Sequence, residues 1–472
     1  MEYARSASTG TVVRKLLPCL LTFGILVPTL TAQSIWWDEG ISLHLAGLPW
    51  IQLLQNRASN IHPPAYFLIL KAWTGLVGRT PFTGRYLSAL AAFLLPALVY
   101  RFLVARAGTR AARAGLVLVA LAPPLVIYGQ EARAYSLLLL WALALWGLVW
   151  PVARRRPSGL LGDPIGRGVL LGLVQAGFLG THYAAVIGVG AAAVAYAVKA
   201  FRARDRELAK ALWTEWLVGA GITALLVAPW LTLVIRAGVG GLGRQAGLAN
   251  LTAEAAPAGY VARLIGIFHT VGLPQALSDP ALTRPSLLVG ALLLLGLALA
   301  FLKARCPRPV PGLLMLWLGP LLSVPVIWYL SPQSHPRYIY PYVFGGWLVA
   351  AAVIAATRVP RVVRLGLLGA ILVTSLLGLQ AYLIDPAYAR SDVRGVAAYV
   401  RDHARAGDLV LVPHTDWSLE QYDVGAATVV MVPPEGGLLP PIAQDVSGEG
   451  GGAGARLVFA MDYRRGALDR RG

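Results

Sequence analysis

Long apolar segments recur along most of this chain and restrict what it can fold into. Hydrophobic residues make up 57% of the 472 residues and charged residues only 13%, and the mean hydropathy is +0.63. This composition predicts an all-α polytopic membrane protein. On a criterion of ~20 apolar residues, we expect about eleven transmembrane helices. They fall near residues 16–35, 86–105, 114–128, 135–152, 168–181, 183–200, 211–235, 286–303, 312–330, 339–357 and 363–383.

The charges are distributed unevenly, which argues against one class of partner. The net charge of the whole chain is +19, and its positive excess lies in the first 383 residues, which hold 32 Lys and Arg against 10 Asp and Glu. The remainder holds 9 basic and 12 acidic residues. This pattern is typical of basic cytoplasmic loops followed by a solvated tail. We therefore expect contacts with membrane lipids and no nucleic acid.

The apolar run from Pro63 to Val77 decides the orientation of the chain. If this run lies in the outer interface, every basic cluster faces the cytoplasm together with the N-terminus, as the positive-inside rule requires. We therefore expect a juxtamembrane helix here, with Lys71 reaching the headgroups, inside a first external loop at 36–85. The protein is then a multi-pass protein of the cytoplasmic membrane with an extracytoplasmic C-terminal tail. The clusters are Arg106, Arg110 and Arg113; Arg154–Arg156; Arg202, Arg204, Arg206 and Lys210; Lys303, Arg305 and Arg308; and Arg358, Arg361 and Arg364.

Residues 384–472 have a different pattern and predict a small extracytoplasmic α/β domain after a transmembrane domain at 1–383. An amphipathic helix is expected to begin at Ser391, because apolar residues then follow at helical spacing. Three short apolar segments beyond it predict strands. These strands are expected at 408–413, 426–432 and 456–460.

Two adjacent carboxylates, Asp38 and Glu39, follow the first apolar segment directly after Trp36 and Trp37. Tryptophans anchor at the membrane interface, so these acids should lie at headgroup depth, where a lipid phosphate has its reactive atoms. A carboxylate there can act as a general base toward a hydroxyl group. Asp38 and Glu39 are therefore the candidate catalytic residues, and a divalent metal between them is left open. The alternative is a helix end marked by solvated acids.

A second set of candidates lies at the outer ends of the spans. Arg85 and Arg133 stand apart from the cytoplasmic clusters, and a guanidinium can hold a phosphate by paired hydrogen bonds. For Arg133 the alternative is an ion pair with Glu131 or with lipid headgroups. For His62 the alternative to substrate binding is that it marks the start of a helix, and one histidine cannot make a metal site. For His182 and Tyr183 the alternative is that they serve packing alone. The candidates for substrate binding are Arg133, Glu131, Arg85, His62, His182, Tyr183, His335 and Arg337.

Several motifs of other enzyme classes are missing from the sequence. There is no P-loop, no dinucleotide fingerprint, no Gly-x-Ser-x-Gly elbow and no His-Glu-x-x-His. The expected outer loops also lack an Asp-x-Asp pair, which gives little support to a mechanism with a nucleotide sugar and a metal. No cofactor is indicated beyond the open question of a divalent metal.

Five motifs stand in order within the first 200 residues. They are Trp37-Asp38-Glu39, Ile61-His62-Pro63-Pro64-Ala65-Tyr66-Phe67, Gly84-Arg85-Tyr86-Leu87-Ser88-Ala89-Leu90, Tyr128-Gly129-Gln130-Glu131-Ala132-Arg133-Ala134-Tyr135 and Gly180-Thr181-His182-Tyr183. Together they resemble the bacterial glycosyltransferase family 39. These are membrane glycosyltransferases of the GT-C fold, related to protein O-mannosyltransferases and lipid A aminoarabinose transferase. From there to about residue 383 the likeness is one of architecture only.

The resemblance implies transfer of a sugar from a polyprenyl-phosphate donor to a hydroxyl acceptor on the outer membrane face, with inversion. Asp38 matches the family's catalytic acid, with Glu39 beside it. Arg133 matches the arginine of the Gln-Glu-Ala-Arg stretch and is expected near the donor phosphate. The implied acceptor is a glycan, a lipid or a protein. The C-terminal region carries no motif that matches the family.

Two other classes of function remain open from the sequence. A transporter or flippase of lipid-linked sugars would also be polytopic, but it should carry polar or broken helices near the midplane. Here the predicted spans are nearly free of charge at their centres. A non-catalytic scaffold that presents the C-terminal domain would have no need of Asp38.

Overall fold

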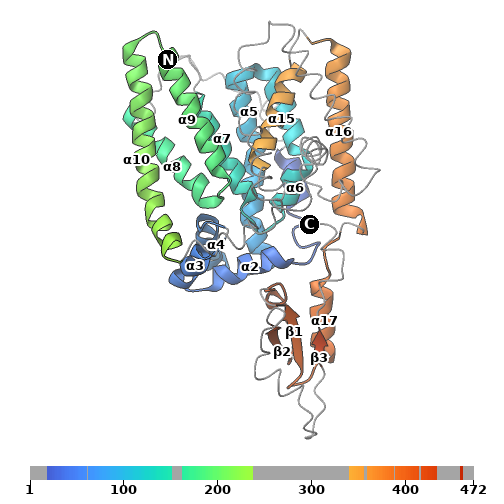
Figure 1. Cartoon of the computed structure of the whole chain (residues 1–472). Coiled ribbons are helices and arrows are strands. Elements are labelled where there is room, and N and C mark those ends of the chain that lie inside the picture. Colours follow the sequence, from blue (N-terminus) through green and yellow to red (C-terminus); the bar gives the residue numbers. More distant parts are fainter. Residues whose placement is uncertain are drawn as a thin grey trace, which may run out of the picture.

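The computed structural model describes residues 19–60, 62–150, 162–237, 340–355, 359–386, 389–413, 416–432 and 458–460. In these ranges the chain forms a helical bundle with a small sheet beyond one of its ends (Figure 1). The spans predicted at 286–303 and 312–330 lie outside the described residues. So do two of the candidate site residues, His335 and Arg337.

The bundle helices coincide with most of the predicted spans. Four of the described helices, α5, α9, α10 and α16, are long and apolar enough to cross a membrane. This agrees with an all-α polytopic protein, while the expected number of about eleven spans stays a prediction. The bundle helices are α5 (Pro81–Ala120), α6 (Pro123–Gly129), α7 (Tyr135–Val149), α8 (Pro164–Thr181), α9 (Ala185–Arg202), α10 (Arg206–Arg236), α15 (Tyr340–Ala355) and α16 (Arg361–Ile384).

Helix α5 contains a sharp break that separates two of the predicted spans. Gly108 has φ 87° and ψ 172°, a conformation that only glycine adopts without strain. The break falls between the segments predicted at 86–105 and 114–128, among the basic residues expected on the cytoplasmic side. Arg106 fixes this end of the bundle by donating from Nε to the Trp150 carbonyl at 3.0 Å and from Nη2 to the Gly147 carbonyl at 2.9 Å.

Helix α8 separates two polar groups that lie at its opposite ends. It has 18 residues, which corresponds to about 27 Å and nearly spans a hydrocarbon core. In its first turn Arg167 pairs with Glu215 of α10 through two bonds of 2.9 and 3.0 Å. At its other end the chain turns at His182. The His182 end is the one that carries the candidate residues described below.

Three short helices lie across that end of the bundle (Figure 1). They are α2 (Trp37–Gly47), α3 (Trp50–Ala58) and α4 (Ala65–Val77), and they pack through a shared apolar cluster. With 13 residues, α4 is short for a spanning helix, as expected of a juxtamembrane one. Lys71 was expected to reach the headgroups, but its Nζ lies 5.1 Å from the Trp50 ring centroid and donates to the Ala46 carbonyl at 3.3 Å.

The tail forms the predicted helix and three strands. These are α17 (Val393–His403), β1 (Leu409–Pro413), β2 (Thr428–Val432) and β3 (Val458–Ala460), with the strands parallel in the order β2-β1-β3. The helix was expected to begin at Ser391, but it begins after Asp392, which is its N-cap because its carboxylate accepts from the Gly395 N–H at 2.9 Å. A 3-10 turn, η6 (Leu419–Gln421), completes the small core.

The tail is docked on α2 and on the segment that precedes it. The Ser34 hydroxyl donates to Asp392 at 3.1 Å, and the Ile35 N–H donates to the Tyr422 hydroxyl at 2.8 Å. His44 lies 2.7 Å from a Glu420 oxygen. The same histidine ring stacks on Trp417 with a centroid distance of 3.5 Å. The tail therefore helps to fix the helix that carries the two candidate acids.

Replacing Gly40 with alanine should loosen this docking. A Cβ at Gly40 would lie 2.4 Å from the Ser418 nitrogen, which is backbone and cannot rotate away. Overpacking costs about 1–3 kcal/mol, which exceeds the gain of about 1 kcal/mol from a better helix former. Limited trypsin digestion of Gly40→Ala should cut the tail faster than in the wild type. Gly75→Ala in α4 is the control, because nothing lies within 4 Å of its Cβ; equal rates for all three proteins would contradict the tight contact.

Candidate functional site

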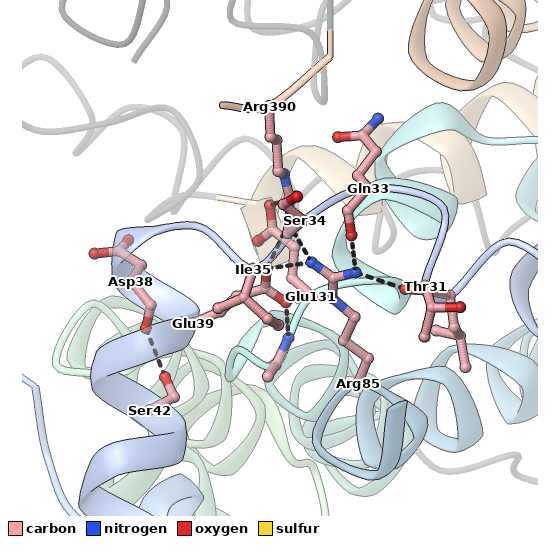
Figure 2. Close-up of polar contacts among 12 residues, drawn as sticks. Thr31, Gln33, Ser34, Ile35, Asp38, Glu39, Ser42, Arg85, Glu131 and Arg390 are labelled. Carbon is pink, nitrogen blue, oxygen red and sulfur yellow. Dashed lines mark hydrogen bonds and ion pairs between the residues drawn. The ribbon is translucent and has the colours of Figure 1, made fainter. Parts of the chain in front are cut away.

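The Glu39 carboxylate is the centre of a buried polar cluster (Figure 2). Glu39 lies in the first turn of α2 and is fully buried. Arg85 of α5 donates to it twice, from Nε to Oε1 at 2.7 Å and from Nη2 to Oε2 at 2.6 Å. The Ala132 N–H donates to Oε1 at 2.8 Å, and Arg390 Nη1 donates to Oε2 at 2.7 Å. Each carboxylate oxygen thus accepts two bonds.

Arg85 uses every donor that its guanidinium has. Besides the two bonds to Glu39, Nη1 donates to the carbonyls of Leu30 at 2.6 Å and Gln33 at 2.8 Å, and Nη2 donates to that of Ser34 at 2.9 Å. A guanidinium has five N–H groups, so none is left over for a phosphate. Arg85 therefore ties the segment before α2 to α5, which is a structural task.

Arg390 is the residue of this cluster that the sequence analysis missed. It comes from the segment between α16 and α17, and its Nη2 donates to Glu131 at 2.6 Å while Nη1 holds Glu39. The only signal in the sequence was a basic residue just beyond a span on the outer side, as with Arg133. Glu39 and Glu131 together balance the charges of Arg85 and Arg390.

The charge state of Glu39 follows from this balance. Burial raises the pKa of the carboxyl, but the guanidinium groups of Arg85 and Arg390 and the Ala132 N–H lower it by more. The net pKa lies below its usual value, so Glu39 is ionised at neutral pH. Its oxygens are nevertheless occupied and shielded from solvent.

Asp38 has a different environment from its neighbour. Figure 2 shows its carboxylate on the side of α2 that faces away from the Glu39 cluster. Its side chain keeps 19% exposure, and Oδ2 lies 3.4 Å from Nη2 of Arg133. Arg133 Nη1 also donates to the Asp38 carbonyl at 3.3 Å, and Nη2 lies 3.4 Å from Nε2 of His62. The structure thus brings Asp38, His62 and Arg133 together.

The turn after α8 adds two more predicted residues to this side. The His182 ring lies 5.5 Å from that of His62 and 6.3 Å from that of Tyr135. The Tyr183 hydroxyl accepts from Trp230 Nε1 of α10 at 3.2 Å, and burial raises the pKa of this phenol. His182 therefore belongs to the Asp38 side of the site, whereas Tyr183 links the turn to α10.

The paired acids do not fit a shared metal ion. Each Glu39 oxygen is held by two N–H donors, and Asp38 faces the other side of α2. In the described part of the chain, no three His, Cys, Asp or Glu side chains converge as metal ligands.

Comparison with known proteins identifies the fold. The sequence matches no model of a known protein family and no curated protein. The structure is similar to that of ArnT from Cupriavidus metallidurans in the apo state, with a TM-score of 0.59 and 14% identity over 93% of this chain and 88% of ArnT. For ArnT bound to undecaprenyl phosphate, the TM-score is 0.58 and the identity 14%, over 96% of this chain and 90% of ArnT. For AglB from Archaeoglobus fulgidus, in complex with an inhibitory peptide and a dolichol-phosphate, the TM-score is 0.52. The identity is 10%, over 88% of this chain and 64% of AglB.

The chain has the GT-C fold. ArnT, a lipid A aminoarabinose transferase, and AglB, an oligosaccharyltransferase, are both membrane glycosyltransferases of this fold. The likeness confirms the fold expected from the five motifs, and the apolar helices agree with a multi-pass membrane protein. At 10–14% identity it concerns the fold and not the activity.

Replacing Glu39 with glutamine should destabilise the protein strongly. The change removes one charge and leaves an excess positive charge on the buried Arg85 and the partly buried Arg390. Removing one partner of a buried ion pair costs about 3–5 kcal/mol. We expect a clear fall in the melting temperature in detergent. Asp402→Asn, on the exposed face of the tail, is the control, and an equal melting temperature for Glu39→Gln would contradict the structural role.

Glu39 should also contribute a defined pH dependence of stability. Its pKa is lower in the folded protein than the usual 4.5, so the folded state releases this proton more readily than the unfolded state. The stabilisation is then fully present above about pH 4.5 and is lost as the pH falls through the lowered folded pKa. Melting temperatures measured from pH 7 down to pH 3 should fall in the wild type below this point. In Glu39→Gln this part of the pH dependence should be missing.

Proposed function

We propose that the protein is a membrane glycosyltransferase that transfers a monosaccharide from a polyprenyl-phosphate donor to a hydroxyl acceptor, with inversion and with Asp38 as the general base. The observation that carries this proposal is the separation of the two adjacent acids. Glu39 is buried in a closed ion cluster, whereas Asp38 keeps partial exposure beside Arg133. Of the pair, only Asp38 is presented to a substrate.

The proposed reaction needs one base and one displaced group. The acceptor hydroxyl gives its proton to the Asp38 carboxylate while its oxygen forms a bond to the anomeric carbon. The bond from that carbon to the phosphate oxygen breaks, and the polyprenyl phosphate leaves with the electron pair. Attack from the face opposite the phosphate inverts the anomeric centre. A single carboxylate is enough for this direct displacement.

Arg133 is proposed to hold the donor phosphate. It lies 3.4 Å from the Asp38 carboxylate, so an anion bound to the same guanidinium would lie close to the base. His62 and His182 line the same side and offer ring nitrogens to the phosphate or the sugar. The choice of a lipid-linked donor is supported by the GT-C neighbours, since one ArnT structure is bound to undecaprenyl phosphate and an AglB structure contains a dolichol-phosphate.

The site is proposed to face the outside of the cytoplasmic membrane. The short helices α2–α4, the docked tail and the His182 turn share one end of the bundle (Figure 1). Arg106 and the Arg167–Glu215 pair mark the opposite end. Because basic residues favour the cytoplasmic side, this arrangement supports a cytoplasmic N-terminus and an external tail. The acceptor, whether glycan, lipid or protein, would then reach Asp38 from outside.

Asp38→Asn should abolish transfer without unfolding the protein. An amide cannot take the acceptor proton, and general base catalysis contributes about 10²–10⁴-fold. Purified wild type and Asp38→Asn would be given a radiolabelled polyprenyl-phosphate sugar and a crude membrane extract as acceptor. We expect labelled product from the wild type and a loss of that order in the variant, whose folded state is checked by its melting temperature. Asp402→Asn serves again as the control, and equal transfer by Asp38→Asn would eliminate Asp38 as the base.

A further inference from the structure

The charges on the two sides of α2 are balanced differently. On the buried side, two carboxylates face two guanidinium groups, those of Arg85 and Arg390. On the Asp38 side, the described residues include Arg133 and a second buried arginine, Arg57, against the one carboxylate of Asp38. Counted over the described residues, this side therefore carries an excess positive charge.

Arg57 is the unusual member of this group. It lies in the last turn of α3, and only 3% of its surface is exposed. Its Nη2 donates to the amide oxygen of Asn56 at 2.6 Å, and its guanidinium carbon stands 4.7 Å from the Phe67 ring centroid. Among the described residues, no carboxylate pairs with it, and its buried Nε–H has no acceptor. A buried guanidinium with a spare donor is costly unless something else binds it.

The electrostatics agree with an incomplete site. Burial, followed by the charge of Arg133, lowers the pKa of the Arg57 guanidinium to about 10. The side chain is still charged at neutral pH, where the two arginines repel one another. An anion between them would relieve both the repulsion and the missing hydrogen bond.

Arg57 lies near the two turns that carry His62 and His182. Helix α3 packs on α10 through Ala58 and Trp230, and Trp230 in turn holds Tyr183, next to His182. Phe67, under the guanidinium, follows the His62 turn, where His62 meets Arg133. Arg57 therefore packs against the start of α4, directly after the turn at which His62 meets Arg133.

We infer that Arg57 and Arg133 together form a two-guanidinium site for the phosphate of the lipid donor. Arg57 stabilises the second negative charge that develops on this phosphate as it leaves. The inference rests on the proposed function. The donor is a phosphodiester with one negative charge, and the released polyprenyl phosphate is a monoester that carries up to two. One guanidinium matches the donor, and a second matches the leaving group. Arg57 is therefore expected to favour the leaving phosphate over the intact donor.

The alternative is a purely structural Arg57, held by its bond to Asn56 and its contact with Phe67. The melting temperature of the lipid-free protein separates the two. Arg57→Met keeps an apolar stem and removes the charge. If the guanidinium awaits an anion, removing it should leave the melting temperature of the lipid-free protein unchanged or raise it. If the guanidinium is structural, the melting temperature should fall, as it should in Arg85→Met, where a buried arginine with all its donors in use is removed.

Binding should be measured with undecaprenyl phosphate in detergent micelles, with undecaprenol as the probe that lacks the phosphate. The wild type should bind undecaprenyl phosphate and be stabilised by it, and undecaprenol should bind much more weakly. Arg57→Met should lose about tenfold to a hundredfold in affinity for undecaprenyl phosphate, the usual worth of a hydrogen bond to a charged group. Arg57→Lys should lose less, since it keeps the charge. Wild-type affinity in Arg57→Met, or a marked loss of its lipid-free stability, would overturn the inference.

The transfer assay separates this inference from the proposed function. Asp38→Asn should still bind undecaprenyl phosphate although it transfers nothing. Phosphate-dependent binding that needs Arg57, in a wild type that transfers no sugar, would uphold the site and reject the transferase. Transfer that needs Asp38 but is unchanged in Arg57→Met would uphold the transferase and reject the site. A wild type that does not distinguish undecaprenyl phosphate from undecaprenol would also reject the site.

Discussion

The paired hydrogen bonds between Glu39 and Arg85 are the interaction on which the rest of the site depends. Glu39 is fully buried and Arg85 nearly so, and such a pair is stable only when the remaining donors and acceptors are satisfied. They are satisfied by backbone groups from the segment before α2 and from Ala132, and by Arg390 from the far end of the sequence. One ion pair thus fixes the relative positions of α2, α5 and the turn after α6.

This constraint explains why two neighbouring acids can have different tasks. Successive residues of an α-helix point about 100° apart, so fixing Glu39 toward α5 turns Asp38 out of the cluster. Asp38 then meets Arg133, which follows directly after the Ala132 amide that holds Glu39. The base and its nearest cation are therefore positioned by the same buried carboxylate. Replacing Glu39 would therefore displace Asp38, although Glu39 itself does not contact the substrate.

The sequence was informative where structure is local. Apolar periodicity predicted most of the described bundle helices and the tail elements to within a few residues, and the positive φ at Gly108 falls where two spans were separated. The span predicted at 114–128 was wrong in one respect, because the structure divides it between the end of α5 and α6. Pairings between distant segments were not accessible in this way. Nothing near Arg390 indicates that it reaches Glu39, which lies 351 positions away. The sequence also could not divide the roles of Asp38 and Glu39, because adjacent acids look alike until the burial of each is known.

The long-range contact of Arg390 also couples the tail to the site. Arg390 and the helix cap Asp392 are two residues apart, and they bind Glu39 and Ser34 respectively, so the carboxylate cluster closes only when the chain beyond α16 is in place. The tail also contacts Ile35, just before this helix, and Gly40 and His44 within it. Without Arg390, the two carboxylates of Glu39 and Glu131 face the single guanidinium of Arg85. The charges of this cluster therefore balance only when the segment that carries Arg390 is docked beside Glu39 and Glu131.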